Sequence, residues 1–230
     1  MSRNNVIKPG FFSKSIAADN RRSEFDVKNE TIVINSIPVD MVFIGDSITH
    51  NWEVNAYFGC GGKLILNRGI GGDTPEYILK RFEADVLQLK PEYAVLSAGI
   101  NETWVLDQRP SETNTLEFIT NKVMNNMASI VDLSQNKQKL VIGSVLPTNI
   151  QLPVPGSYSN NIRNELVVKI NNRLKTMAEQ RGIIYVDYHS QLTASDGKTL
   201  IGEVSEDGIH PNVYGYNIMA QVLQKSILLD

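Results

Sequence analysis

Short apolar runs alternate with longer amphipathic segments along most of this 230-residue chain. An apolar run that stops at glycine, serine or a polar residue is typical of a buried strand. The runs that fit are residues 41–45, 64–67, 93–97, 140–145 and 183–187. Because they are apolar throughout instead of alternating, we expect both faces of their sheet to be covered.

The segments between these runs have apolar residues at helical spacing. They predict helices over residues 48–58, from Thr74 through about residue 89, and over 111–133, 162–181 and 212–229. In the third of these, one face collects Leu116, Ile119, Val123, Met127, Ile130 and Leu133. Strands that alternate with helices predict an α/β fold, in which a five-stranded parallel sheet is covered by helices through right-handed crossovers.

The first part of the chain has a weaker pattern. Residues 1–40 are interpreted as an N-terminal arm, followed by one domain over residues 41–230. Within the arm, Phe25 and Val27 alternate with acidic residues, as they would in a half-buried strand. A turn-like Lys-Asn-Glu follows, so a hairpin is expected over residues 23–36.

Composition excludes several classes of function. The net charge of −3 and the pI near 5.7 give no basic field for a nucleic acid. One cysteine, Cys60, rules out a disulfide framework within the chain. No apolar run has the length of a signal peptide or a membrane span, so a cytoplasmic protein without a membrane span is expected. No cluster of side chains has metal-ligand spacing, so neither a metal nor a cofactor is expected. The sequence leaves the oligomeric state open.

The strongest candidate for chemistry is Ser47, which lies two residues after the end of the first strand. Asp46 and Ser47 lie where the next helix begins, because short polar side chains cap unpaired N–H groups. A hydroxyl there lies at the carboxyl edge of the sheet and at the positive end of a helix. Proteins of the α/β class place their reactive groups at that edge.

A serine hydroxyl becomes a good nucleophile only when an oriented base takes its proton. The chain has three histidines, and one of them, His210, follows Asp207 by three residues. A tight turn at Gly208 would bring that carboxylate to Nδ1 and leave Nε2 facing outward. This arrangement predicts a Ser47–Asp207–His210 triad.

The other two histidines are weaker candidates for the base. His189 follows Asp187 at a strand end, where such a pair more often orients a loop. His50 lies one helical turn after Ser47, so it is expected to line the pocket while pointing away from the hydroxyl.

Attack on a carbonyl also requires donors for the developing oxyanion, each contributing about 3 kcal/mol. Three strand ends supply candidates: the Ser47 amide, the Gly72 amide in a glycine-rich turn, and the Asn101 side-chain amide. Asp46, His50, Trp52 and Trp104 are further candidates for substrate binding. The two tryptophans are also compatible with packing at the edge of the core.

Four segments together resemble the four sequence blocks of the SGNH (GDSL-type) hydrolase superfamily. They are Gly45-Asp46-Ser47-Ile48, Gly69-Ile70-Gly71-Gly72-Asp73-Thr74, Gly99-Ile100-Asn101 and Asp207-Gly208-Ile209-His210. The second is similar to that of the platelet-activating-factor acetylhydrolase-like branch and of bacterial carbohydrate acetyl esterases. The chain departs from the usual pattern at Ile48, where leucine is typical, and at Glu102, where aspartate is common.

The resemblance implies a flavodoxin-like, three-layer α/β/α sandwich and ester hydrolysis without a cofactor. It implies Ser47 as nucleophile, Asp207 and His210 as the orienting group and base, and Ser47, Gly72 and Asn101 as the oxyanion hole. The expected reaction is hydrolysis of a short acyl ester, an O-acetyl group on a carbohydrate, through an acyl-enzyme. Two alternatives remain: hydrolysis of longer acyl esters or lysophospholipids, and a catalytically silent ligand-binding module on the same fold.

Overall fold

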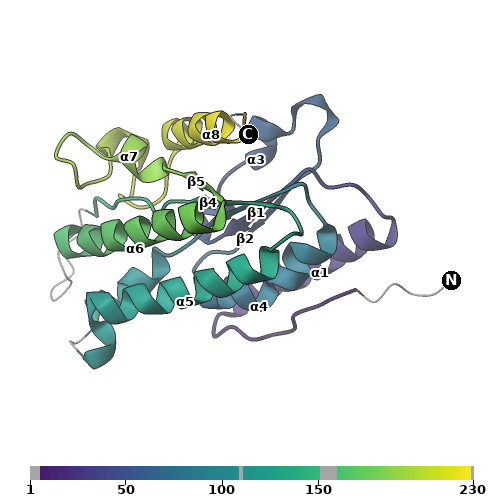
Figure 1. Cartoon of the computed structure of the whole chain (residues 1–230), viewed down its shortest axis with the longest axis horizontal. Helices are drawn as coiled ribbons and strands as arrows, with labels where there is room; N and C mark the ends of the chain where they lie inside the picture. The colour runs from purple at the N-terminus through teal and green to yellow at the C-terminus, as the bar shows by residue number, and fades with distance from the viewer. Residues whose placement is uncertain (1–5, 109–110, 151–159, 229–230) are drawn as a thin grey trace. The chain divides into compact units, whose positions relative to one another are not determined.

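The five predicted strands are confirmed. The computed structural model describes residues 6–108, 111–150 and 160–228 (Figure 1). Its strands form one parallel sheet in the order β2-β1-β3-β4-β5. Their bounds are β1 (Met41–Gly45), β2 (Ile65–Gly69), β3 (Tyr93–Ser97), β4 (Lys139–Gly143) and β5 (Ile184–Val186). The ends of β1 and β2 are in register, with Gly45 opposite Gly69, so the segments that follow both strands begin side by side.

Helices flank this sheet, as the α/β prediction requires (Figure 1). They are α1 (Ile16–Ile34), α2 (Ser47–His50), α3 (Val54–Phe58), α4 (Pro75–Asp85), α5 (Leu116–Ser134), α6 (Asn160–Arg181), α7 (Tyr188–Leu192) and α8 (Val213–Leu228). The expected helices over 162–181 and 212–229 correspond to α6 and α8, except that residue 229 lies outside the described residues. In α5, Leu133 is 39% exposed, although its helical spacing places it on the same face as the buried residues Ile119 and Ile130. None of the described helices has both the length and the apolar character needed to cross a bilayer.

The chain divides into two compact units, which are described separately. Unit 1 comprises Met1–Leu96 and Asn126–Leu140, and unit 2 comprises Ser97–Asn125 and Val141–Asp230. In unit 1, α4 packs against α1 and β1, while α2 and α3 pack against β2. In unit 2, α6 and α8 pack against β5, and α7 packs against α8. The division into an arm over residues 1–40 and a domain over 41–230 stays a prediction.

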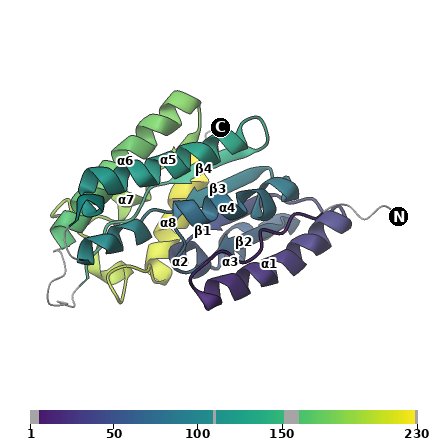
Figure 2. The ribbon, with the colours of Figure 1, turned by 90° about the horizontal axis from the view of Figure 1, so that it is seen from below.

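The predicted hairpin over residues 23–36 is wrong, because residues 23–34 belong to the single helix α1 (Figure 2). Ser15 caps the start of α1 through its side-chain oxygen, which accepts a hydrogen bond from the Ala18 amide. The buried face of α1 consists of Ala18, Arg22, Phe25, Asn29 and Ile32, at helical spacing. Since two of these residues are polar, a search for apolar periodicity alone misses the helix.

The single helix predicted over residues 48–58 is also wrong, because α2 and α3 are separate. The Asn67 side-chain amide donates to the carbonyl oxygens of Thr49 at 2.8 Å and Trp52 at 2.9 Å. The Trp52 ring is 3% exposed and packs edge-on against Phe43. A long-range hydrogen bond and a buried aromatic anchor therefore stop the helix that local periodicity favours.

Candidate active site

Ser47 is the first residue of α2 and is separated from the end of β1 by Asp46 alone, as predicted. Asp46 caps this turn, because its Oδ1 accepts a hydrogen bond from the Ile48 amide at 2.9 Å. The Asp46 side chain is buried, and its carboxylate shapes the turn that carries Ser47. Substrate binding by Asp46 stays a prediction.

The backbone of α2 lies directly against the end of β2. A Cβ atom built on Gly69 would lie 2.2 Å from the His50 amide nitrogen, closer than real Cβ atoms approach. The Gly45 carbonyl accepts a hydrogen bond from the Ile70 amide at 3.0 Å. Because of this close approach, the segment after β2 begins in contact with the turn that carries Ser47.

That segment forms a tight turn from Ile70 to Asp73, closed by a hydrogen bond from the Asp73 amide to the Ile70 carbonyl at 3.1 Å. Gly72 has a φ of +80°, which only glycine adopts readily. No heavy atom would lie within 4 Å of a Cβ on Gly72. A Cβ on Gly71 would lie 3.9 Å from the Cβ of Ser47. The turn that contains the candidate oxyanion donor Gly72 thus lies beside the candidate nucleophile, with open space next to Gly72.

A cavity of about 260 Å³ lies next to this turn within unit 1. Its walls come from Ser13, Lys14, Ser15 and Ala18 near the start of the chain, and from Gly71, Gly72, Asp73 and Tyr77. The N-terminal segment therefore contributes to the surroundings of Gly72. Sequence reasoning missed this contribution, because nothing in the pattern of residues 13–15 distinguishes it from a solvent-exposed arm.

In unit 2, the expected pairing of Asp207 with His210 is confirmed. The ring Nδ1 of His210 lies 2.6 Å from Asp207 Oδ2. The other carboxylate oxygen accepts hydrogen bonds from the backbone amides of Ile209 and His210, at 2.9 and 2.8 Å. Gly208 has a φ of +77°, and a Cβ there would collide with the Asn149 carbonyl at 2.1 Å. The glycine thus permits the tight turn that joins the carboxylate to the imidazole.

The contacts in this turn keep Asp207 ionised. Burial favours a higher pKa for its carboxyl group, but the hydrogen bonds from His210 and Ile209 outweigh burial and lower the pKa to about 2. A charged carboxylate that accepts from Nδ1–H fixes the orientation of an imidazole ring. The turn therefore orients the His210 ring, and Ser205 Oγ donates a further hydrogen bond to Asp207 at 3.2 Å.

Asn101 begins a 3₁₀ helix, Asn101–Asp107, that follows β3. Its Oδ1 accepts a hydrogen bond from the indole Nε1 of Trp104 at 3.1 Å. The guanidinium of Arg163 lies 4.1 Å from the centre of the Trp104 ring and pairs with both oxygens of Asp107 at 2.8 Å. Since Oδ1 is used as the acceptor, the donor Nδ2 of Asn101 points away from Trp104. Sequence reasoning missed Arg163, whose position in a long helix carries no visible signal.

Comparison with known proteins agrees with these observations. The sequence pattern of the GDSL-like lipase/acylhydrolase family matches residues 43–218, which is most of the chain. The chain belongs to this family. It is therefore a carboxylic ester hydrolase, acting on small ester substrates.

This GDSL-like acylhydrolase is similar to two curated relatives and to one solved structure over most of its length. It is 24% identical to an acetylxylan esterase of Geobacillus stearothermophilus over 72% of this chain and 73% of that protein. It is 27% identical to platelet-activating factor acetylhydrolase IB subunit alpha1 of Rattus norvegicus, over 82% of this chain and 75% of that protein. A GDSL-like lipase structure from Bacteroides thetaiotaomicron superposes with a TM-score of 0.73 and 27% identity, covering 90% of this chain and 97% of that one.

In this GDSL-like acylhydrolase, the contacts of His189 fit the expectation that the Asp187–His189 pair orients a loop. Asp187 caps α7 by accepting a hydrogen bond from the Ser190 amide at 3.0 Å. The His189 ring Nδ1 lies 3.4 Å from Thr193 Oγ1, and burial lowers the pKa of the ring. The Asp187–His189 pair therefore starts a helix and orients the loop after β5.

His50 and Trp52 have different surroundings. His50 is half-buried, and burial followed by the nearby charge of Arg21 lowers its pKa. Its Nδ1 lies 3.9 Å from the position of a Cβ on Gly71, so the ring lines the turn beside Ser47 as expected. Trp52 is 3% exposed and packs on Phe58, which fits the alternative that it packs at the edge of the core. Substrate binding by Trp52 stays a prediction. In the described residues, no group of three or more His, Cys, Asp or Glu side chains is arranged to hold a metal ion.

Proposed function

We propose that this acylhydrolase is a serine esterase that removes short acyl groups, in particular O-acetyl groups from a carbohydrate, through an acyl-enzyme. The observation that carries the proposal is the 2.6 Å contact between His210 Nδ1 and Asp207 Oδ2, which prepares an oriented base. Ser47 on its capped turn after β1 supplies the nucleophile. The topology supports their pairing, because the carboxyl ends of parallel strands are where α/β enzymes gather reactive groups.

In the first half of the reaction, His210 Nε2 accepts the hydroxyl proton while Ser47 Oγ attacks the ester carbonyl carbon. This step requires Nε2 to come within hydrogen-bond distance of Oγ. The charge that develops on the carbonyl oxygen is stabilised by the amides of Ser47 and Gly72 and by Asn101 Nδ2. The tetrahedral intermediate then collapses, and the imidazolium returns the proton to the departing alcohol oxygen.

In the second half, His210 takes a proton from water as the water oxygen attacks the acyl carbonyl of the acyl-enzyme. Collapse of the second tetrahedral intermediate breaks the bond to Ser47 Oγ, which regains a proton from the imidazolium. The products are the free alcohol and a carboxylic acid. Asp207 stays ionised throughout and stabilises the imidazolium in both halves.

Two observations favour a short acyl group. Both curated relatives described above are named for an acetyl group, one of them on the sugar polymer xylan. The cavity beside Gly72 has a volume of about 260 Å³ and is lined by hydroxyl groups and charged side chains such as Ser13, Lys14 and Tyr77. A long acyl chain would require an apolar channel, whereas this lining suits hydroxylated substrates.

The test compares initial rates on 4-nitrophenyl acetate, 4-nitrophenyl octanoate and acetylated xylooligosaccharides. The proposal predicts at least about a tenfold preference in kcat/KM for acetate over octanoate, and release of acetate from the sugar. S47A should lose about a thousandfold or more in kcat, whereas S190A, at an exposed serine on α7, should keep full activity. Preference for octanoate would favour a longer-chain esterase, and equal rates for S47A and wild type would overturn the serine mechanism.

A further inference from the structure

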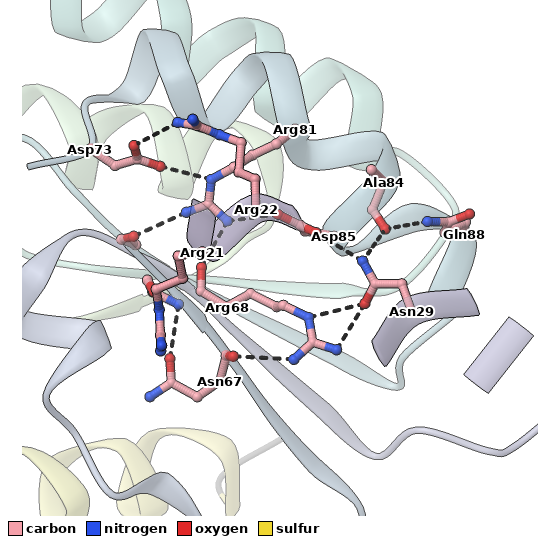
Figure 3. A network of polar contacts seen from close by, with 12 residues as sticks. Arg21, Arg22, Asn29, Asn67, Arg68, Asp73, Arg81, Ala84, Asp85 and Gln88 are labelled. Atoms are coloured by element: carbon pink, nitrogen blue, oxygen red, sulfur yellow. Dashed lines mark hydrogen bonds and ion pairs between the residues drawn. The ribbon is translucent and has the colours of Figure 1, made fainter. Parts of the chain in front are cut away.

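A buried network of charged side chains connects the turn that carries Gly72 to the turn that carries Ser47 (Figure 3). Its centre is Arg81 on α4, which is fully buried. The guanidinium donates to Asp73 Oδ2 at 2.7 Å, to Asp85 Oδ2 at 2.9 Å, and to the carbonyl oxygens of Arg68 and Gly45. One side chain thus joins the ends of β1 and β2 to α4.

The Gly45 carbonyl is the point where the two turns meet. It accepts hydrogen bonds from Arg81 Nη2 at 3.1 Å and from the Ile70 amide at 3.0 Å. Gly45 is the last residue of β1, two positions before Ser47, and Ile70 is the first residue of the turn that contains Gly72. Arg81 therefore anchors the strand end before the nucleophile and, through Asp73, the far end of the neighbouring turn.

Asp73 is fixed by two arginines from different helices. Its Oδ2 accepts from Arg81, and its Oδ1 accepts from Arg22 Nη2 of α1 at 3.1 Å. Arg22 is itself held by Asp19 at 2.6 Å and lies 4.0 Å from the centre of the Phe12 ring. The Asp73, Arg22 and Arg81 side chains are each at most 1% exposed. The closing residue of the turn is thus held from α1 on one side and from α4 on the other.

Asp73 closes the turn in which Gly72 is the left-handed residue, so a fixed Asp73 restricts the directions open to the Gly72 amide. A glycine at this position is conformationally free unless the residues beside it are fixed. Buried ion pairs contribute little net stability compared with packed apolar side chains. Geometric control of a neighbouring group is therefore a better explanation for this network than stability alone.

We propose that Asp73, clamped between Arg22 and Arg81, is a positioning residue that aligns the Gly72 amide with the developing oxyanion. This inference rests on the proposed function, in which Gly72 is an oxyanion donor. Because a misaligned donor weakens stabilisation of the transition state more than binding of the ester, loss of the clamp lowers kcat and leaves KM nearly unchanged. Substitution of a residue with only a structural role would lower the melting temperature without selectively lowering kcat relative to KM.

The test compares D73N with D85N, a matched control. Asp85 is equally buried and also pairs with Arg81, but it is the last residue of α4, and its Oδ1 accepts a hydrogen bond from Asn29 Nδ2 at 2.9 Å. Rates on 4-nitrophenyl acetate are measured well below both melting temperatures. D73N should lower kcat about tenfold or more with KM changed by less than about twofold, whereas D85N should keep kcat within about threefold of wild type.

Equal losses of kcat in D73N and D85N, or full kcat in D73N, would overturn the clamp. If D73N does not fold, R22Q tests the same carboxylate, since it removes one donor and leaves Arg81 in place. R22Q should lower kcat severalfold, and full kcat in R22Q would also overturn the clamp. The S47A variant distinguishes failure of this inference from failure of the proposed function. If S47A is inactive while D73N has normal kcat, only the positioning role of Asp73 is wrong. If S47A is fully active, the proposed function is wrong, and the positioning role of Asp73 is wrong with it.

Discussion

The His210 imidazole and the Asp207 carboxylate are joined by a 2.6 Å contact, although only two residues separate them in the chain. Both side chains are partly open to solvent, at 33% and 52% exposure. A pair of this kind adds little to folding stability. Its geometry is therefore better explained by catalysis than by stabilisation of the fold.

H210A and H189A should accordingly behave differently. H210A should lose about a thousandfold or more in kcat on an aryl acetate with little change in melting temperature, because it removes the base. H189A should keep most of the activity, since His189 contacts Thr193 in the loop after β5. Steady-state rates and thermal unfolding measure both effects. If H189A were inactive and H210A active, His189 would be the base.

The lowered pKa of Asp207 determines the shape of the pH–rate profile. With a pKa of about 2, the carboxylate stays charged between pH 8 and pH 4. Its protonation should therefore not steepen the acid side of the profile, and kcat/KM should decline by no more than about tenfold per pH unit over this range. Rates of the folded enzyme between pH 8 and 4, with folding checked by circular dichroism, measure this slope. A decline of log(kcat/KM) with pH that is twice as steep as this above pH 4 would contradict the account.

Trp104 should act through Asn101. W104F removes the indole N–H that donates to Asn101 Oδ1, so one of the hydrogen bonds that orient the side-chain amide is lost. We expect kcat to fall about three- to tenfold with KM nearly constant, because one oxyanion donor is less well aligned. W52F is the control, since Trp52 is a core residue beside Phe43 and its replacement should lower the melting temperature and spare kcat. An unchanged kcat in W104F would remove Trp104 from the catalytic account.

Gly69 should tolerate substitution far less well than Gly71. In G69A the new methyl group would meet the His50 amide nitrogen at 2.2 Å, whereas in G71A its nearest neighbours lie 3.9 Å away. G69A should therefore lower the free energy of unfolding by about 2 kcal/mol or more, because β2 and α2 must separate. G71A should change it by less than about 0.5 kcal/mol. Urea denaturation compares the two, and equal stability would show that α2 moves freely.

The strands and much of the site could be predicted from local sequence. Each strand is an apolar run with a polar stop, and the Asp207–His210 pair is contained in one short turn at Gly208. Such features are encoded by neighbouring residues, so the sequence reveals them without knowledge of the fold. The same holds for the Asp46 cap, which depends on a side chain and an amide two residues apart.

The errors occurred where distant residues override a local preference. In α1, Arg22 and Asn29 are buried because Asp73 and Asp85 lie opposite them, and their polar character hid the helix. After Ser47, the helix ends early because the Asn67 side chain of β2 donates hydrogen bonds to the carbonyl oxygens of Thr49 and Trp52. Neither partner is visible from the segment itself, so periodicity alone could not have predicted these outcomes.

The most direct test of the account is covalent trapping of the nucleophile. The enzyme is incubated with a fluorophosphonate, and the labelled peptide is identified by mass spectrometry in wild type, S47A and H210A. The account predicts one adduct at Ser47 in wild type, no adduct in S47A, and labelling at least about a hundredfold slower in H210A, because the base is missing. An adduct on another residue, or labelling of S47A at the wild-type rate, would contradict the assignment of Ser47 as the nucleophile.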